Sequence, residues 1–369
     1  MKENLKLLRG ANLVDEAILI LYQWANKDAL EQIKEEYRGL YPEDQKRYDR
    51  IWDILLDIYY TVKEELKPKK DRIDYYFKSQ NNNYFFLASF AFLWDFHCTE
   101  NKLISYEERF GKLTEEEILK AYAQVISIDE ADVMAADEVQ TYDDFISFLD
   151  ASSCSREMKW DILKIFHQQK EAYEEVATLI RETVNLIERQ FGRQIAELEQ
   201  GFYDYWSGLQ EKEDILALVQ RNLKVTWEVN EKGTILLPML FQPISVTLAV
   251  HTDTKIYDIL HIGIILDQRL ITNARRMGPE DIVNIGKLLC DKSKVDILKM
   301  TAEKPCYGKE IAAELGLSTA TISYHVNALM KLGLLQAELS SNRVYYSINQ
   351  EKLTEYLEDI RKYFTKEIR

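Results

Sequence analysis

The sequence has few of the residues that interrupt helices. Among its 369 residues there are 13 Gly and 6 Pro. Because Gly and Pro are the least favourable residues in a helix interior, this scarcity indicates long helices. Hydrophobic residues make up 46% of the chain and aromatic residues 11%, which is enough for a folded core and excludes disorder over most of the length. We expect two or three domains.

Cysteine and long apolar runs are also scarce. The four cysteines show no C-x-x-C or C-x-C spacing, which excludes a local zinc or dithiol motif and fits a reducing compartment. The most apolar segment, Tyr84–Phe96, has 13 residues and is too short to cross a bilayer. Asp15 and Glu16 interrupt the N-terminal run that a signal peptide would need. We therefore predict a soluble cytoplasmic protein without a membrane partner.

The common catalytic motifs are missing as well. The sequence contains no G-x-G-x-x-G, no P-loop, no H-E-x-x-H and no G-x-S-x-G. Asp95 and His97 are either a couple in a pocket or a satisfied buried pair. The neighbouring aromatic residues either line an apolar ligand pocket or form ordinary core: Tyr84, Phe85, Phe86, Phe90, Phe92, Trp94 and Phe96. We expect no enzyme, no cofactor and no metal.

The spacing of hydrophobic residues predicts helices over almost all of residues 1–222. One predicted helix face, with spacings of three and four residues, holds Ile51, Leu55, Ile58 and Val62. Thr114 followed by Glu117 indicates an N-cap with a capping-box glutamate. Residues 156–206 predict one long helix, or two with a break near Gly192. Such a helix is either a spine or dimer interface, or a buried helix of a single bundle.

The hydrophobic period changes from 3.6 to 2 in residues 223–277. Alternation at 224–230, 244–250 and 255–262 predicts short strands of a small sheet with one polar face. Helical patterns return in residues 278–349 and in a C-terminal helix, 350–369. The predicted fold class is mainly α with a small antiparallel sheet (α+β).

Residues 278–349 predict a winged helix-turn-helix. Ser293 is a plausible N-cap of one helix, Gly316 a left-handed end of the next, and Ser318 the N-cap of a third, about 318–332. The inner stripe of that third helix consists of Ile322, Val326, Leu329 and Leu332. A β-hairpin follows, with its turn at Ser341 and Asn342. This element order is that of a DNA-reading domain.

The outer face of the predicted recognition helix carries short hydroxyl and amide side chains in place of the Glu and Lys typical of a solvated face. Such groups suit close approach to base edges and phosphates. From the helix, its flanks and the hairpin we take the following DNA-binding candidates: Lys294, Ser318, Thr319, Thr321, Ser323, Tyr324, His325, Asn327, Lys331, Ser341, Asn342 and Arg343.

Residues 285–349 resemble the DNA-binding domain of the ArsR family of bacterial repressors. The resemblance is carried by "LLCDKSKVDIL", "GKEIAAELGLSTATISYHVNAL", "LMKLGLL" and "NRVYYSI". It implies a homodimer that represses transcription, a recognition helix at Ser318–Leu329 and a wing at about 336–348. Lys294 stands where the family usually has Arg, and His325 falls at the family's usual His. That histidine either contacts a phosphate or holds the helix against its neighbour.

The resemblance does not extend to a metal site. Metal-sensing relatives carry a cysteine pair in the helix before the recognition helix, but here "GKEIAAEL" has none. Another group uses histidines of the terminal helix, and residues 350–369 contain none. Cys306 stands alone and is either a redox switch or inert packing.

Charge is divided unevenly along the chain. Residues 284–349 hold eight Lys and Arg against six Asp and Glu, a net +2, and residues 350–369 hold five of each sign. Residues 1–283 therefore hold 34 basic against 51 acidic residues, a net −17. This segregation would orient the protein on DNA and oppose non-specific binding.

Three hypotheses follow from the sequence. The first is a dimeric regulator that binds double-stranded DNA at a pseudo-palindromic operator and senses a ligand, apolar or aromatic, or a partner through its N-terminal region. The second is a DNA-binding dimer whose N-terminal region only dimerises or scaffolds. The third is an enzyme, or an interaction or scaffold factor, whose winged helix does not read DNA.

Overall fold

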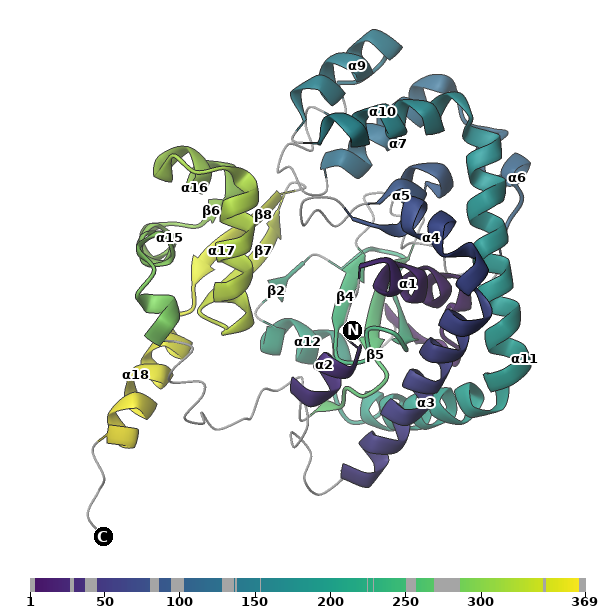
Figure 1. Ribbon diagram of the computed structural model, residues 1–369. Coiled ribbons are helices and arrows are strands. Elements are labelled where there is room, and N and C mark those ends of the chain that lie inside the picture. The colour runs from purple at the N-terminus through teal and green to yellow at the C-terminus, as the bar shows by residue number, and fades with distance from the viewer. Residues whose placement is uncertain are drawn as a thin grey trace. The chain divides into compact units, whose positions relative to one another are not determined.

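The chain forms two compact units in the computed structural model (Figure 1). Unit 1 comprises Met1–Lys212 and Asn230–Leu266, and unit 2 comprises Glu213–Val229 and Asp267–Arg369. The structure describes residues 4–26, 30–36, 45–79, 86–93, 103–127, 136, 138–152, 154–223, 225–227, 229–249, 257–268, 286–340 and 343–364.

Unit 1 is built mainly from helices. They are α1 (Leu13–Asn26), α2 (Leu30–Glu36), α3 (Gln45–Glu65), the 3-10 turn η2 (Lys67–Lys69), α4 (Lys70–Phe77), α5 (Leu87–Phe92), α6 (Tyr106–Phe110), α7 (Glu115–Ser127), α9 (Tyr142–Ala151), α10 (Arg156–His167) and α11 (Gln169–Gln210). The predicted stripe of α3 is confirmed, because Ile51, Leu55, Ile58 and Val62 are all buried.

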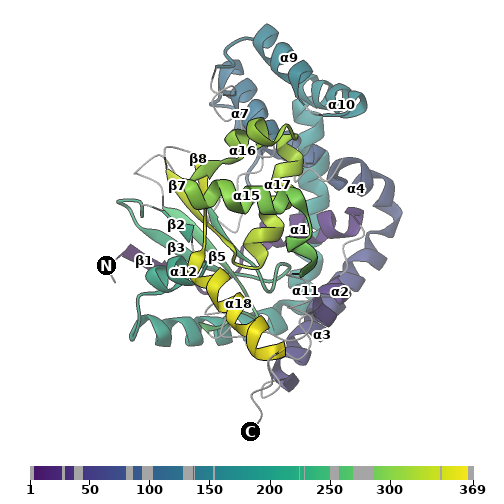
Figure 2. The same ribbon diagram turned by 90° about the vertical axis from the view of Figure 1, so that its left-hand side faces the viewer.

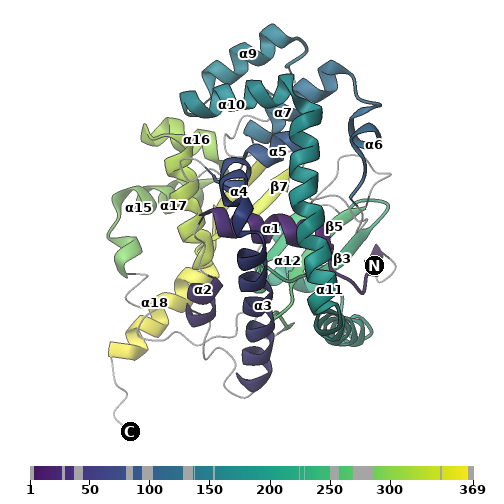
Figure 3. The same cartoon turned by 45° about the vertical axis from the view of Figure 1, so that its right-hand side comes forward.

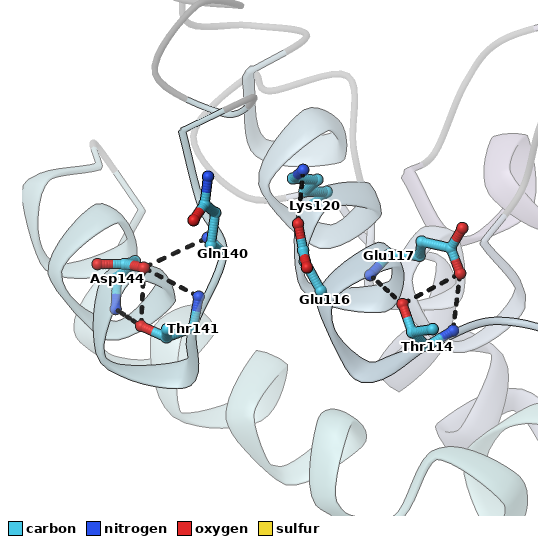
Figure 4. Close-up of polar contacts among 7 residues, drawn as sticks. All are labelled: Thr114, Glu116, Glu117, Lys120, Gln140, Thr141 and Asp144. Atoms are coloured by element: carbon cyan, nitrogen blue, oxygen red, sulfur yellow. Dashed lines mark hydrogen bonds and ion pairs between the residues drawn. The ribbon is translucent and has the colours of Figure 1, made fainter.

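The capping box predicted for α7 is present (Figure 4). The Glu117 backbone N–H donates to the Thr114 hydroxyl at 3.2 Å, and the Thr114 N–H donates to the Glu117 carboxylate at 2.7 Å. Thr141 and Asp144 make the same reciprocal pair at the start of α9. Each box satisfies two N–H groups that a helix start leaves unpaired.

The long helix differs from its prediction. The break falls at Gln168, between α10 and α11, and α11 continues through Gly192 for 42 residues. The buried Gln169 side chain stabilises this break, since its amide donates to the carbonyls of Phe90 (3.2 Å) and Ala91 (2.8 Å). A single glycine such as Gly192 lowers the stability of a helix interior without ending the helix. Figures 1 and 3 show α11 changing direction toward its C-terminal end.

Unit 1 also contains a four-stranded sheet in the order β1-β3-β5-β4, formed by β1 (Leu5–Leu7), β3 (Thr234–Met239), β4 (Val246–Ala249) and β5 (Asp258–Gly263). The pairs β1–β3 and β3–β5 are parallel, and only β4 is antiparallel. The predicted polar face is wrong for β5, which is buried at all six positions. The sequence predicted no strand at residues 234–239, where β3 is also buried at all six positions. Strands buried on both faces lose the alternation that sequence reading relies on.

Unit 2 contains α12 (Ile215–Leu223), β2 (Val225–Thr226), α15 (Lys292–Glu303), β6 (Cys306–Tyr307), α16 (Gly308–Leu315), α17 (Thr319–Lys331), β7 (Leu335–Ser340), β8 (Arg343–Ile348) and α18 (Gln350–Phe364). Its sheet has the order β2-β7-β8-β6, with an antiparallel β7–β8 hairpin. Figure 2 shows α15, α16 and α17 beside this hairpin. The α+β class and the winged helix-turn-helix agree with the sequence prediction.

The first predicted strand of the small sheet lies elsewhere than expected. Residues 225–226 form β2, which pairs in parallel with β7 of the winged helix and not with the strands of unit 1. The sequence boundary expected between residues 222 and 223 therefore falls inside unit 2. Local alternation gives a strand's existence but not its partner, because pairing depends on residues far along the chain.

Candidate DNA-binding surface

The turn between α16 and α17 has the predicted chemistry. Gly316 ends α16 in the left-handed conformation (φ 64°, ψ 30°), and the Leu317 N–H donates to the Ala312 carbonyl at 3.1 Å. Ser318 caps α17 by accepting the Thr321 N–H at 3.1 Å, and the two hydroxyls lie 2.8 Å apart. Both predicted caps are confirmed, and together they set the direction in which α17 leaves the turn.

Helix α17 has one buried and one exposed face. Ile322, Val326 and Leu329 are buried in the core of unit 2. Ser323, Tyr324 and Asn327 are exposed, and Thr319 and Thr321 are half-buried. Tyr324 is 69% exposed. Lys331 ends the helix, and its side chain lies outside the described residues.

A polar cluster joins the start of α15 to α17. The Lys294 ammonium lies 2.5 Å from the Asp291 carboxylate and 5.7 Å from the centre of the Tyr324 ring. Lys294 is only 9% exposed. The Lys294 hydrogen bond holds the pKa of Asp291 below its usual range. The structure thus places Lys294 next to Tyr324, with its charge already paired inside the protein.

Asp291 is a residue of this cluster that the sequence reading missed. Helix α15 begins at Lys292, and Asp291 is its N-cap, accepting the Ser293 N–H at 3.0 Å. The prediction of Ser293 as the cap was therefore wrong by two positions. Asp and Ser are equally good caps, and the signal that could have decided between them is Lys294, three residues after Asp291.

His325 turns away from the exposed face. It is 9% exposed, its Nδ1 lies 3.7 Å from the Asp291 carboxylate, and its ring packs edge-on to the Tyr324 ring at 5.5 Å. The 3.7 Å between the His325 Nδ1 and the Asp291 carboxylate is too long for a hydrogen bond. Of the two roles considered for His325, these contacts favour the one in which it holds α17 against its neighbour.

The structure describes both strands of the wing, β7 and β8. Ser340 pairs with Arg343 across the hairpin, while Ser341 and Asn342 lie outside the described residues. The Arg343 guanidinium lies 5.0 Å above the centre of the Tyr307 ring, which meets the Tyr345 ring edge-on at 5.7 Å. Sequence reading missed Tyr307, since a two-residue strand such as β6 leaves no periodic signal.

Cys306 is buried next to this aromatic group. Its thiol donates to the Lys304 carbonyl at 3.3 Å, and burial raises the pKa of the thiol. A protonated, buried thiol is a poor nucleophile, which favours inert packing over a redox switch.

Among the residues that the structure describes, no group of three or more His, Cys, Asp and Glu could hold a metal ion. Within the described ranges, every helix is too short or too polar to span a lipid bilayer.

The C-terminal region of the chain is similar to known proteins. Residues 291–337 match the family described as "Bacterial regulatory protein, arsR family". The HTH-type transcriptional regulator CmtR of Mycobacterium bovis is 28% identical over 84 residues, which is 23% of this chain and 71% of the relative. The CmtR proteins of two Mycobacterium tuberculosis strains match to the same extent.

No solved structure matches the chain significantly. The family match spans the N-cap of α15, the α16–α17 turn and the first residues of β7. The cap and turn chemistry described above thus lies within the matched residues. Residues 291–337 thus match an ArsR-family helix-turn-helix, within a chain several times longer than that segment.

Proposed function

We propose that this protein is a DNA-binding transcriptional regulator that acts as a homodimer. Its two α17 helices would enter successive major grooves, roughly 34–36 Å apart, on a pseudo-palindromic operator. Each β7–β8 wing would reach the adjacent backbone or minor groove. Repression is the direction of regulation that the ArsR resemblance favours.

The exposed face of α17 carries this proposal. It offers a hydroxyl, a phenol and an amide at Ser323, Tyr324 and Asn327, and none of these groups is needed by the core beneath. Hydroxyl and amide groups are the donors and acceptors that read base edges. The half-buried Thr319 and Thr321 lie at the helix start, where backbone N–H groups favour a phosphate.

Arg343 is the wing residue for which we propose a DNA contact. The Arg343 guanidinium lies over the Tyr307 ring, and this contact helps to fix its position. Lys294 enters the proposal in a different role. With its ammonium on Asp291 and its side chain next to the Tyr324 ring, it would position Tyr324 and not contact a phosphate itself.

Dimerisation is supported by charge and by α18. A winged helix of net charge +2 binds a polyanion weakly, and two copies double the number of phosphate contacts. On α18, Tyr356 is buried and its hydroxyl donates to the Leu332 carbonyl at 2.6 Å, while Leu357 is 56% exposed. An exposed leucine next to a buried tyrosine gives α18 an outer apolar position that a second copy would cover.

The N-terminal region would supply the signal. The aromatic stretch considered as a ligand pocket is packed where it is described: Phe86 contacts Tyr22 and Phe77, and Phe92 stacks on Tyr173. The Asp95–His97 couple lies outside the described residues. A non-metal ligand would therefore have to bind elsewhere in unit 1.

The test is binding of the purified protein to the DNA upstream of its own gene, measured by fluorescence anisotropy. Tyr324→Ala should weaken binding by about 1–3 kcal/mol, which is the range for one base-reading contact. Trp160→Ala is the matched control, because Trp160 on α10 is also 69% exposed but lies in unit 1. It should leave the affinity unchanged.

Two results would contradict the proposal. If Tyr324→Ala binds the upstream DNA as the natural sequence does, α17 does not read bases. If no DNA binds more tightly than random duplex, the protein is an interaction factor whose winged helix does not read DNA sequence. Native mass spectrometry of the same samples checks the dimer.

A further inference from the structure

A groove runs between α3 and the C-terminal part of α11, which lie side by side in Figures 1 and 3. It has a volume of about 150 Å³. Its apolar floor is formed by Ile51, Ile54, Leu198, Phe202 and Ile264. An apolar cavity of about this volume is large enough for benzene. All its lining residues belong to unit 1.

A glycine keeps this groove open. Gly201 lines it from the interior of α11, on the same helix face as Gln194 and Leu198. A Cβ at Gly201 would meet no atom within 4 Å, so neighbouring elements do not require a glycine there. Glycine inside a helix is unfavourable relative to alanine. What its missing side chain provides is space in the groove.

The rim of the groove has a positive charge. Arg47 and Arg50 line it from α3, and Glu197 lines it from α11. Both carboxylate oxygens of Glu197 are already engaged, one by Arg50 at 3.1 Å and the other by Arg193 at 3.3 Å. No ion pair of Arg47 is found among the described residues. Within the part of the chain that the structure describes, Arg47 is thus a cation above an apolar floor, in a region of net charge −17.

We propose that this groove binds a small aromatic carboxylate. The ring would lie on Ile54 and Phe202 in the space left by Gly201, and the carboxylate would pair with Arg47 at the rim. A guanidinium matches a carboxylate with two parallel N–H bonds. That such a ligand changes operator binding rests on the proposed function, whereas the site itself does not.

The first test is a titration of the full chain with benzoate, and with benzylamine as a cation of the same shape, followed by ligand-observed NMR. Benzoate should bind more tightly than benzylamine by about tenfold or more, the factor that corresponds to 1.4 kcal/mol. Gly201→Leu should fill the groove and weaken benzoate binding by a similar factor, and Arg47→Gln should remove most of the preference for benzoate.

Gly208→Leu is the matched control. Gly208 lies in the same helix, two turns from Gly201 on the same face, also meets no atom within 4 Å, and does not line the groove. Both leucine variants should keep or raise the melting temperature, which verifies folding, but only Gly201→Leu should lose benzoate. Equal binding of benzoate and benzylamine, or undiminished benzoate binding by Gly201→Leu, overturns the proposal.

A second measurement separates this inference from the proposed function. Affinity for the upstream DNA is measured with and without saturating benzoate. A change that Gly201→Leu abolishes supports a sensing role for the groove. If benzoate binds but no specific DNA binding exists, the proposed function fails and the site stands. If DNA binds and benzoate does not, the site fails and the function stands.

Discussion

The Asp291 carboxylate caps α15 and at the same time binds the Lys294 ammonium at 2.5 Å. One acidic side chain therefore both caps a helix and pairs with the lysine that lies beside Tyr324 on α17. This arrangement gives Lys294 the position expected of a phosphate contact but not the free charge.

Replacing Lys294 tests that distinction. We expect Lys294→Met to weaken DNA binding modestly, because Tyr324 loses a neighbour, without changing the dependence of log affinity on log salt concentration. Each lysine that contacts a phosphate contributes about one to that salt slope. A slope lower by about one in Lys294→Met would mean that Lys294 leaves Asp291 to bind the backbone. Affinities at four or more salt concentrations give the slope.

Arg343 should behave in the opposite way. Arg343→Ala removes the charge held over Tyr307, so we expect binding to weaken equally on specific and random DNA and the salt slope to fall by about one per protomer. Arg343→Lys keeps the charge and should keep the slope. An unchanged slope in Arg343→Ala would place the wing away from the phosphates.

Gly316 should be required for stability. Its positive φ of 64° is unfavourable for residues with a Cβ, so Gly316→Ala should lower the free energy of unfolding by roughly 1–2 kcal/mol. No neighbouring atom lies within 4 Å, so the cost is that of the backbone conformation alone. Gly286→Ala is the control, since Gly286 is helical and equally unencumbered, and should not destabilise. Urea unfolding measures both; equal midpoints would contradict the prediction.

The stability of unit 1 should depend on pH through Glu16. Its carboxyl group is buried, and its two oxygens accept the N–H groups of Leu240 (2.7 Å) and Phe241 (2.8 Å). Burial raises the pKa of Glu16 from 4.5 to about 8, although these two bonds act in the opposite direction. Between those values the folded state holds a proton that the unfolded state has released, so stability falls as pH rises.

The window above pH 6.5 excludes the contribution of His261. Burial lowers the pKa of His261, which lines the same small cavity, from 6.5 to about 4, and its contribution changes only below pH 6.5. Glu199 has a raised pKa and acts in the same direction as Glu16. We expect unfolding to become easier by roughly 1.4 kcal/mol per pH unit between pH 6.5 and 8. Glu16→Gln should flatten the curve and the exposed Glu116→Gln should not; a Glu16→Gln curve as steep as the natural one contradicts this.

The parts of the fold that sequence predicted are those governed by local rules. The stripe of α3, the capping box at Thr114, and the caps at Gly316 and Ser318 depend on residues within one or two turns. The sheet of unit 1 depends on Leu5 pairing with Thr234, across more than two hundred residues, and β3 and β5 are too thoroughly buried to alternate. No local pattern contains that information.

In the candidate DNA-binding surface, too, the features set by local pattern were predicted and those set by packing between elements were not. The exposed face of α17 follows from helical period, so Ser323, Tyr324 and Asn327 lie where the sequence predicted. The pairing of Lys294 with Asp291, the burial of His325 and the Tyr307 ring beneath Arg343 depend on packing between elements. The groove between α3 and α11 is of the same kind, since each helix alone shows only an ordinary apolar stripe.

The two-residue strand β2 has a consequence for protein engineering. Residues 213–229 belong to unit 2 although the following residues, 230–266, complete the sheet of unit 1, so the chain passes between the units three times. The helix-turn-helix therefore cannot be separated from the rest of the protein by one cut in the chain. A fragment starting at residue 267 would leave the outer edge of β7 without its parallel partner, an unpaired strand edge that invites aggregation. A fragment that begins at residue 213 and replaces residues 230–266 by a short linker would keep that edge covered.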